Sequence, residues 1–215
     1  MKNILKAPLI PKDLDSVNQI GQIAEDIKNA EISAVKVSNT SFDQAQLHEI
    51  NIDQAVFEND DFSGHDMDFS SFSNVIFNSC NFSNTSFTNA SLGRAEFNNC
   101  KLVGADFSLS GLISTKFDSC NLEFSNFNSA VFDPTLFLKC QMHSADFFAS
   151  KSVKVLFDNC SLVQATLQIP LKDMDMSSND ISGIVISRDD LKGAIVSKTQ
   201  AIDLVNLLGV KVKQD

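Results

Sequence analysis

The sequence contains no tryptophan and no tyrosine, although it contains 18 phenylalanines. A varied globular core draws on all three aromatic types, so this bias indicates one structural position that is filled many times. The chain also lacks any run of 18 apolar residues, which excludes a membrane-spanning helix. Positive charge is scarce as well, because 17 Lys and Arg residues face 27 Asp and Glu residues, for a net charge of −10.

This shortage of positive charge is strongest in the middle of the chain. Residues 40–170 contain 15 acidic and 6 basic residues, a net charge of −9. Such a field repels nucleic acid and anionic membranes and attracts basic surfaces. We therefore expect a protein partner, with no direct nucleic-acid contact and no membrane contact.

The first residues carry no secretory signal, because Pro8 and Pro11 follow Met1–Lys6 without an apolar segment between them. A cytoplasmic location is therefore expected.

Large apolar residues recur every five positions from Phe42 to Leu167, at 25 of 26 positions, with Ser152 as the exception. Fifteen of the 18 phenylalanines obey this period, and only Phe69, Phe124 and Phe148 depart from it. A mostly small residue stands two positions before each large one, with a polar residue between them, as in Ala105-Asp106-Phe107. This alternation predicts a short extended segment with two inward side chains. The remaining two residues suit a corner, so the chain is expected to wind into coils that pair with the coils above and below.

The cysteines give the number of sides. They are spaced by 20 residues without exception, which equals four five-residue units, so each coil should be square. One set of phenylalanines has the same spacing and should form a second column in the core. The predicted core ladders are Cys80, Cys100, Cys120, Cys140 and Cys160, and Phe57, Phe77, Phe97, Phe117, Phe137 and Phe157. A straight inward ladder lacks the tetrahedral arrangement and close spacing of a zinc site, so we expect free thiols, no metal and no cofactor.

These features resemble the pentapeptide-repeat proteins, whose loose motif is Ala-Asp/Asn-Leu/Phe followed by two variable residues. The resemblance implies an all-β solenoid, a right-handed quadrilateral parallel β-helix of about eight coils. It covers about residues 30–196, with a one-residue deletion beside Pro170, after which the large positions continue from Leu171 to Val196.

Both ends of such a solenoid need caps, because an open end exposes core and unpaired backbone. Residues 1–29 are expected to form a partly helical N-terminal cap. Residues 197–215 are expected to form a C-terminal helix and a short strand. An apolar surface there would favour pairing of two chains through their C-terminal ends. The predicted dimer interface comprises Ala201, Leu204, Val205, Leu207, Leu208, Val210 and Val212.

The tail also resembles the close of the quinolone-resistance (Qnr) type, through Asp190-Leu191-Lys192-Gly193, Gln200-Ala201 and Leu207-Leu208-Gly209-Val210. The match is best to loop-free chromosomal members from Gram-positive bacteria, since no insertion interrupts residues 42–167. This resemblance implies a homodimer that mimics DNA, binds a type II topoisomerase (DNA gyrase or topoisomerase IV) and protects it from quinolones. The alternative is a structural or interaction scaffold with an unrelated protein partner.

No arrangement of nucleophile, base and orienting group is present, so an enzyme is not expected. Asp60 and His65 take adjacent inward positions and have no assigned role. The candidate partner-binding surface is acidic and comes from residues 43–68, which contain no Lys or Arg. It comprises Asp43, Glu49, Asp53, Glu58, Asp61, Asp66 and Asp68.

Overall fold

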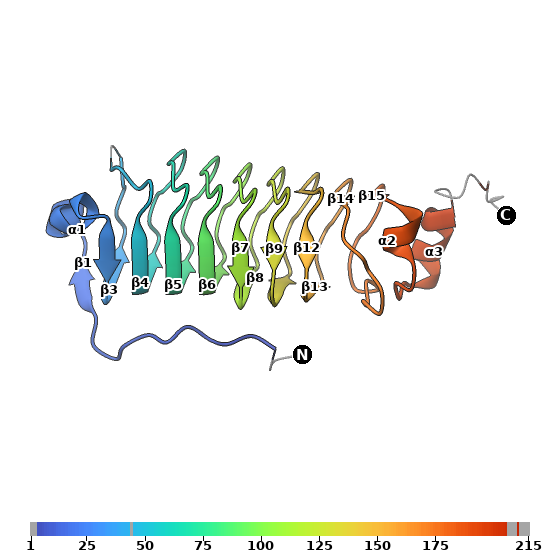
Figure 1. Cartoon of the computed structure of the whole chain (residues 1–215), viewed down its shortest axis with the longest axis horizontal. Helices are drawn as coiled ribbons and strands as arrows, with labels where there is room; N and C mark the ends of the chain where they lie inside the picture. The colour runs from blue at the N-terminus through green and yellow to red at the C-terminus, as the bar shows by residue number, and fades with distance from the viewer. Residues whose placement is uncertain (1–3, 44, 206–209, 211–215) are drawn as a thin grey trace.

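The chain forms a straight rod of stacked square coils with helices at both ends (Figure 1). The computed structural model describes residues 4–43, 45–205 and 210. Its solenoid has about nine turns, which confirms the predicted all-β solenoid and adds about one turn to the expected number. The extra turn arises because β1 (Asp15–Val17) already pairs with β3 (Val35–Ser38) inside the expected cap.

The strands are short and pair in parallel with the strand one coil away. Ile52 lies beside Phe72 and Phe57 beside Phe77, an offset of 20 residues that makes each coil four five-residue units. Besides β1 and β3, the strands are β2 (Glu31–Ser33), β4 (Asn51–Glu58), β5 (Ser71–Asn78), β6 (Ser91–Asn98), β7 (Gly111–Ile113), β8 (Thr115–Asp118), β9 (Val131–Phe132), β10 (Thr135–Leu138), β11 (Asp146–Phe147), β12 (Lys151–Ser152), β13 (Val155–Asp158), β14 (Thr166–Leu167) and β15 (Val185–Ile186).

We name the four sides of the rod by their large inward residues. Face A has the column that contains Ile52 and Phe72, and face B has the column that contains Phe57 and Phe77. Face C has the column that contains Phe62 and Phe82, and face D has the column that contains Met67 and Phe87. On each face, the residue before the large one points outward, and the two residues after it form the corner to the next face.

The corners explain much of the polar sequence. The second residue after almost every large position has a positive φ, as at Asn59 (57°), Asn99 (54°) and Ser119 (57°). Asn and Gly adopt this left-handed conformation most readily, because other side chains clash with the backbone there. The five-residue period therefore records one such corner per unit.

The core consists of columns that run along the rod. In the face B column, consecutive phenylalanine rings from Phe57 to Phe157 stack with centroids 4.9 to 5.2 Å apart. The five cysteines stack in the small inward position of face C and are free thiols. Both ladders therefore lie where the 20-residue spacing puts them.

The coil shortens by one residue near Pro170. Ser161 pairs with Asp180 and Thr166 with Val185, offsets of 19, and the offset returns to 20 between Asp175 and Ile195. Asn179 then occupies the position that follows Cys160 in the ladder, and its Oδ1 accepts a hydrogen bond from the Cys160 amide (2.8 Å).

Two helices cover the C-terminal end of the rod, α2 (Arg188–Leu191) and α3 (Lys198–Val205). Gln200 of α3 is buried, and its Nε2 donates to the carbonyl oxygens of Met176 (3.0 Å) and Asn179 (2.7 Å). These bonds satisfy backbone acceptors that no further coil can reach, so α3 closes the core.

At the N-terminal end, η1 (Ile20–Ile23) and α1 (Ala24–Lys28) cover the first coil. The segment before β1 does not cover this end but runs back along the outside of the rod (Figure 1). Its Leu9 amide donates to Asn74 Oδ1 (3.1 Å), which also accepts from Arg94 Nε (2.6 Å). Asn74 stands at the corner between faces A and B, so the segment covers part of that edge. No described helix is long and apolar enough to cross a membrane.

Candidate protein-binding surface

Face D is the side of the rod with the least positive charge. Its outward residues and corners from Gln46 to Gln168 include acidic residues from Glu49 to Asp146 but no Lys or Arg. The acidic residues are Glu49, Asp66, Asp68, Asp106 and Asp146. Face D therefore carries only negative formal charge over six coils, with carboxylates on four of them.

The other faces differ in charge. Face C carries Asp43, Asp61, Glu123 and Asp180 with a single Lys101. The other middle-section cations lie on face A (Arg94, Lys151 and Lys154) and face B (Lys116 and Lys139). On face B, Lys116 Nζ also contacts Glu96 Oε2 at 2.7 Å, so part of the negative charge there is neutralised.

The predicted acidic surface is divided among all four faces. Asp53 lies on face A, Glu58 on face B, and Asp43 and Asp61 on face C. Glu49, Asp66 and Asp68 lie together on face D. Residues close in sequence wind around a square coil, whereas residues 20 apart are neighbours on the surface. For this reason the order of residues in the sequence does not indicate that Asp106 and Asp146 share this face. Their common position within the 20-residue coil does.

Around His48, the face D carboxylates form a compact group. His48 Nδ1 lies 3.0 Å from Asp66 Oδ1, and His48 Nε2 lies 3.6 Å from Glu49 Oε1. The hydrogen bond and charge of Asp66 raise the pKa of His48. The Asp68 amide and His48 together lower the pKa of Asp66, so this carboxylate stays charged in mildly acidic solution.

Asp60 and His65 form no hydrogen bond with each other, and the side chain of each bonds backbone groups instead. Asp60 is buried, and its two carboxylate oxygens accept from the amides of Thr40 (2.7 Å) and Glu58 (2.9 Å). His65 Nε2 lies 2.8 Å from the Phe42 carbonyl oxygen. Burial raises the pKa of Asp60 to about 6. Both residues support the first coils, and Asp60 lies between Thr40 and Cys80 in the column that continues as the cysteine ladder.

The cysteine ladder has the environment of packed, unreactive thiols. Cys120 Sγ donates to the Phe97 carbonyl oxygen (3.3 Å), and Cys140 Sγ donates to that of Phe117 (3.5 Å). Neighbouring thiols and burial raise the pKa of Cys140 to about 12. Among the described residues, no group of three or more His, Cys, Asp or Glu side chains could hold a metal ion.

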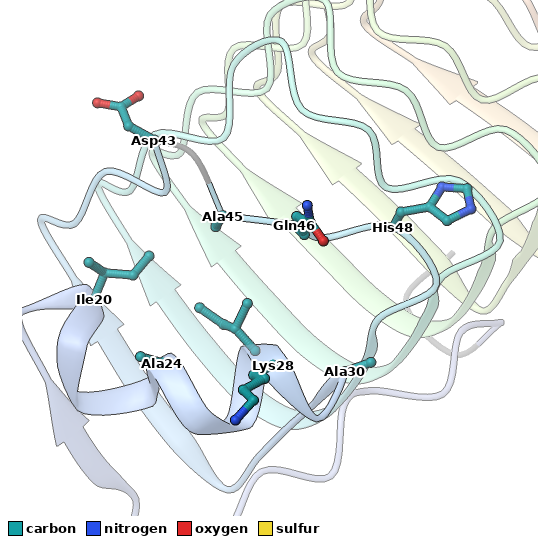
Figure 2. A pocket seen from close by; sticks show the side chains of 9 residues that line it. Ile20, Ala24, Lys28, Ala30, Asp43, Ala45, Gln46 and His48 are labelled. Atoms are coloured by element: carbon teal, nitrogen blue, oxygen red, sulfur yellow. The ribbon is translucent and has the colours of Figure 1, made fainter.

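A hollow of about 490 Å³ lies between α1 and the first coil (Figure 2). Its lining includes Ile20, Ala24 and Ala45, and also Asp43 and Lys28, whose charged ends point in opposite directions. The hollow is therefore mainly a gap left where a helix replaces a coil.

The C-terminal end has a second, apolar hollow of about 220 Å³. Of the predicted dimer residues, Ala201, Leu204 and Val205 line it, together with Leu191, Ala194 and Val196. Val210 is exposed. Leu207, Leu208 and Val212 lie outside the described residues.

Comparison with known proteins identifies the repeat. Residues 66–108 match the family model described as pentapeptide repeats (8 copies), and residues 90–167 match the model of a pentapeptide repeat region. No curated protein matches the chain.

Several solved structures resemble the chain at low identity. HetL, a pentapeptide-repeat protein involved in heterocyst differentiation regulation in the cyanobacterium Nostoc sp. strain PCC 7120, is 17% identical, with a TM-score of 0.49, over 84% of this chain and 98% of HetL. Trypsin-treated QnrB1, a plasmid-mediated fluoroquinolone resistance protein, is 19% identical, with a TM-score of 0.45, over 86% of this chain and 92% of QnrB1. These values are too low to carry a functional argument.

The two family models together match residues 66–167, so this part of the chain consists of pentapeptide repeats, in agreement with its four-sided, 20-residue coil.

Proposed function

We propose that this pentapeptide-repeat protein is a non-catalytic, cytoplasmic binding protein that presents its acidic faces to the basic DNA-binding groove of a type II topoisomerase, DNA gyrase or topoisomerase IV. The observation that carries the proposal is the charge distribution. Faces C and D are adjacent, and from Ala45 to Gln168 carboxylates recur along both of them with Lys101 as the only Lys or Arg. A basic groove attracts such a surface as it attracts DNA.

The mimicry is partial in charge density. Asp66, Asp106 and Asp146 occupy the same position on every second coil, so about 10 Å separates them. Duplex DNA carries one charge per ~1.7 Å of its axis. We therefore expect binding that weakens as salt increases, with less protection from quinolones than a denser mimic would give.

A supercoiling assay with purified DNA gyrase, with and without ciprofloxacin, tests this function. The protein should inhibit supercoiling at micromolar concentration and reduce drug-stabilised DNA cleavage. The variant Asp66→Asn/Asp106→Asn/Asp146→Asn should bind gyrase about tenfold more weakly, at about 0.5 kcal/mol per exposed carboxylate. Asn is a conservative choice because Asn126 already holds the same position.

A matched control removes three charges elsewhere. Asp53→Asn/Asp118→Asn/Asp133→Asn changes the net charge equally but lies on faces A and B, and it should bind nearly as the parent does. Equal loss in both variants would mean that only net charge matters. No binding by the parent would contradict the topoisomerase proposal and favour a scaffold with another protein partner.

The same proposal includes a homodimer through the C-terminal ends. Its support is the apolar hollow beside α3 and the exposed Ile202 and Val210. Light scattering should give twice the monomer mass, and Ala201→Glu, which charges the rim of the hollow, should give the monomer mass with an unchanged circular dichroism spectrum. A monomeric parent protein would exclude this dimer.

A further inference from the structure

Three phenylalanines of this chain do not contribute to the core. Phe69, Phe124 and Phe148 are 58%, 60% and 46% exposed, and Leu109 is 56% exposed. By contrast, phenylalanines that follow the five-residue period, such as Phe97 and Phe107, are fully buried. The exposed side chains therefore gain little from folding.

The backbone at three of these positions is also unfavourable for a large side chain. Phe69, Leu109 and Phe124 stand at corners and have φ values of 58°, 60° and 58°. The same corner positions in the preceding coils hold Glu49, Asn89 and Gly104. A bulky residue with a left-handed backbone raises the energy of the folded chain. Neither the exposure of these side chains nor their backbone conformation therefore stabilises the fold.

All four residues lie on one side of the rod. Phe69 and Leu109 stand at the corner between faces D and A, Phe124 stands at the corner between faces C and D, and Phe148 follows the large residue of face D. Within three consecutive coils, Leu109, Phe124 and Phe148 flank the carboxylates of Asp106 and Asp146. Asp146 Oδ1 accepts a hydrogen bond from the backbone amide of Phe148 (2.9 Å), which fixes the carboxylate beside the backbone that carries the Phe148 ring.

We propose that face D from Asp106 to Ala149 is a docking surface for a protein segment that carries Arg or Lys beside large apolar side chains. The basic groups of the partner contact Asp106 and Asp146, and its apolar groups pack on Leu109, Phe124 and Phe148. Charge complementarity selects this occupant, because the outward positions of face D between Asp106 and Ala149 contain no Lys or Arg. Exposed apolar groups beside charges are a common arrangement at protein interfaces.

Under the proposed function, face D would be the surface that contacts the topoisomerase. The docking surface itself does not require that the partner is a topoisomerase. Binding through face D differs from DNA mimicry because it includes apolar contacts, which the phosphate backbone of DNA does not offer. Binding through face D should therefore persist at salt concentrations that abolish a purely electrostatic contact.

The test uses two triple variants of the full chain. The anchor variant, Leu109→Asn/Phe124→Asn/Phe148→Ser, takes its residues from the same positions in other coils, Asn89, Asn84 and Ser108. The control variant, Ile113→Ser/Val131→Ser/Val153→Ser, removes three exposed apolar side chains from face A, where Ser71 and Ser73 hold equivalent positions.

The probe is a fluorescent synthetic peptide that alternates Arg and Leu, measured by anisotropy. The parent and control variant should bind it equally, and the anchor variant about tenfold more weakly. A peptide that alternates Arg and Ser should bind the parent about as weakly. Equal binding of both peptides, equal binding by the anchor variant, or no binding by the parent would overturn the proposal.

Two further measurements separate the possible roles. The melting temperature of the anchor variant should equal or exceed that of the parent, whereas a clear decrease would assign these residues to folding. Gyrase binding is then compared between the parent and the anchor variant. If the parent binds the peptide but not gyrase, only the topoisomerase partner is contradicted. If the anchor variant binds gyrase as well as the parent does, gyrase does not use face D.

Discussion

At the residue scale, Asp60 is the clearest departure from the repeat. It occupies the small inward position that cysteine fills in the next five coils, and it bonds two amides rather than packing. Burial raises its pKa to about 6, from an ordinary value of 3.8, because the charged carboxylate is poorly solvated. The folded protein therefore binds this proton more tightly than the unfolded chain does.

This pKa has a measurable consequence for stability. Between about pH 4 and pH 6 the unfolded chain releases the proton while the folded protein keeps it, so the contribution of Asp60 to stability falls as the pH rises, by up to about 3 kcal/mol. Asp60→Cys, which extends the cysteine ladder, should remove this part of the pH dependence. Urea unfolding of both proteins at pH 4 and pH 6.5 measures the difference, and parallel profiles would contradict the prediction.

At the element scale, the stacked columns separate structural from surface phenylalanines. Phe97 is fully buried between Phe77 and Phe117, with ring centroids 4.9 Å away on each side. Its replacement leaves a cavity that rigid neighbouring coils cannot fill.

Phe97→Ala should therefore lower the free energy of unfolding by about 3–5 kcal/mol. Phe124→Ala, which removes the same ring from an exposed corner, should change it by less than about 0.5 kcal/mol. Denaturant unfolding measures both values. Similar losses in the two variants would show that the corner ring also supports the fold.

At the scale of the whole molecule, the 20-residue coil makes the rod divisible. Deletion of residues 101–120 removes one complete coil and brings Phe97 next to Phe137, so every column remains continuous. Deletion of residues 101–115 keeps the five-residue period but rotates the rest of the chain by one face, which breaks the cysteine and phenylalanine columns.

The 20-residue deletion should fold with a single cooperative transition and a modestly lower melting temperature, because stability in repeat proteins is roughly a sum over neighbouring units. The variant that lacks 15 residues should be clearly less stable, although it retains more of the chain. Circular dichroism melting compares them. Equal stability would mean that column identity contributes little beyond the five-residue period.

The interior of this protein could be predicted from its sequence for a physical reason. Each inward position repeats at a fixed interval, so the columns that contain Phe57 and Cys80 follow from spacing alone. The left-handed corners recur with the same five-residue period and often hold Asn, Ser or Gly. The end structures were predicted only in part, because the path of residues 4–14 along the rod depends on a contact with the distant Asn74.

The surface required the tertiary structure. Charge runs in the sequence suggested one acidic patch from Asp43 to Asp68, but a square coil distributes neighbouring residues over four sides and joins residues 20 apart. Inward residues are constrained by packing against identical neighbours, so the sequence by itself determined the fold. Outward residues have no such constraint, and only the winding of the coil decided that Asp106, Phe124 and Asp146 share a face.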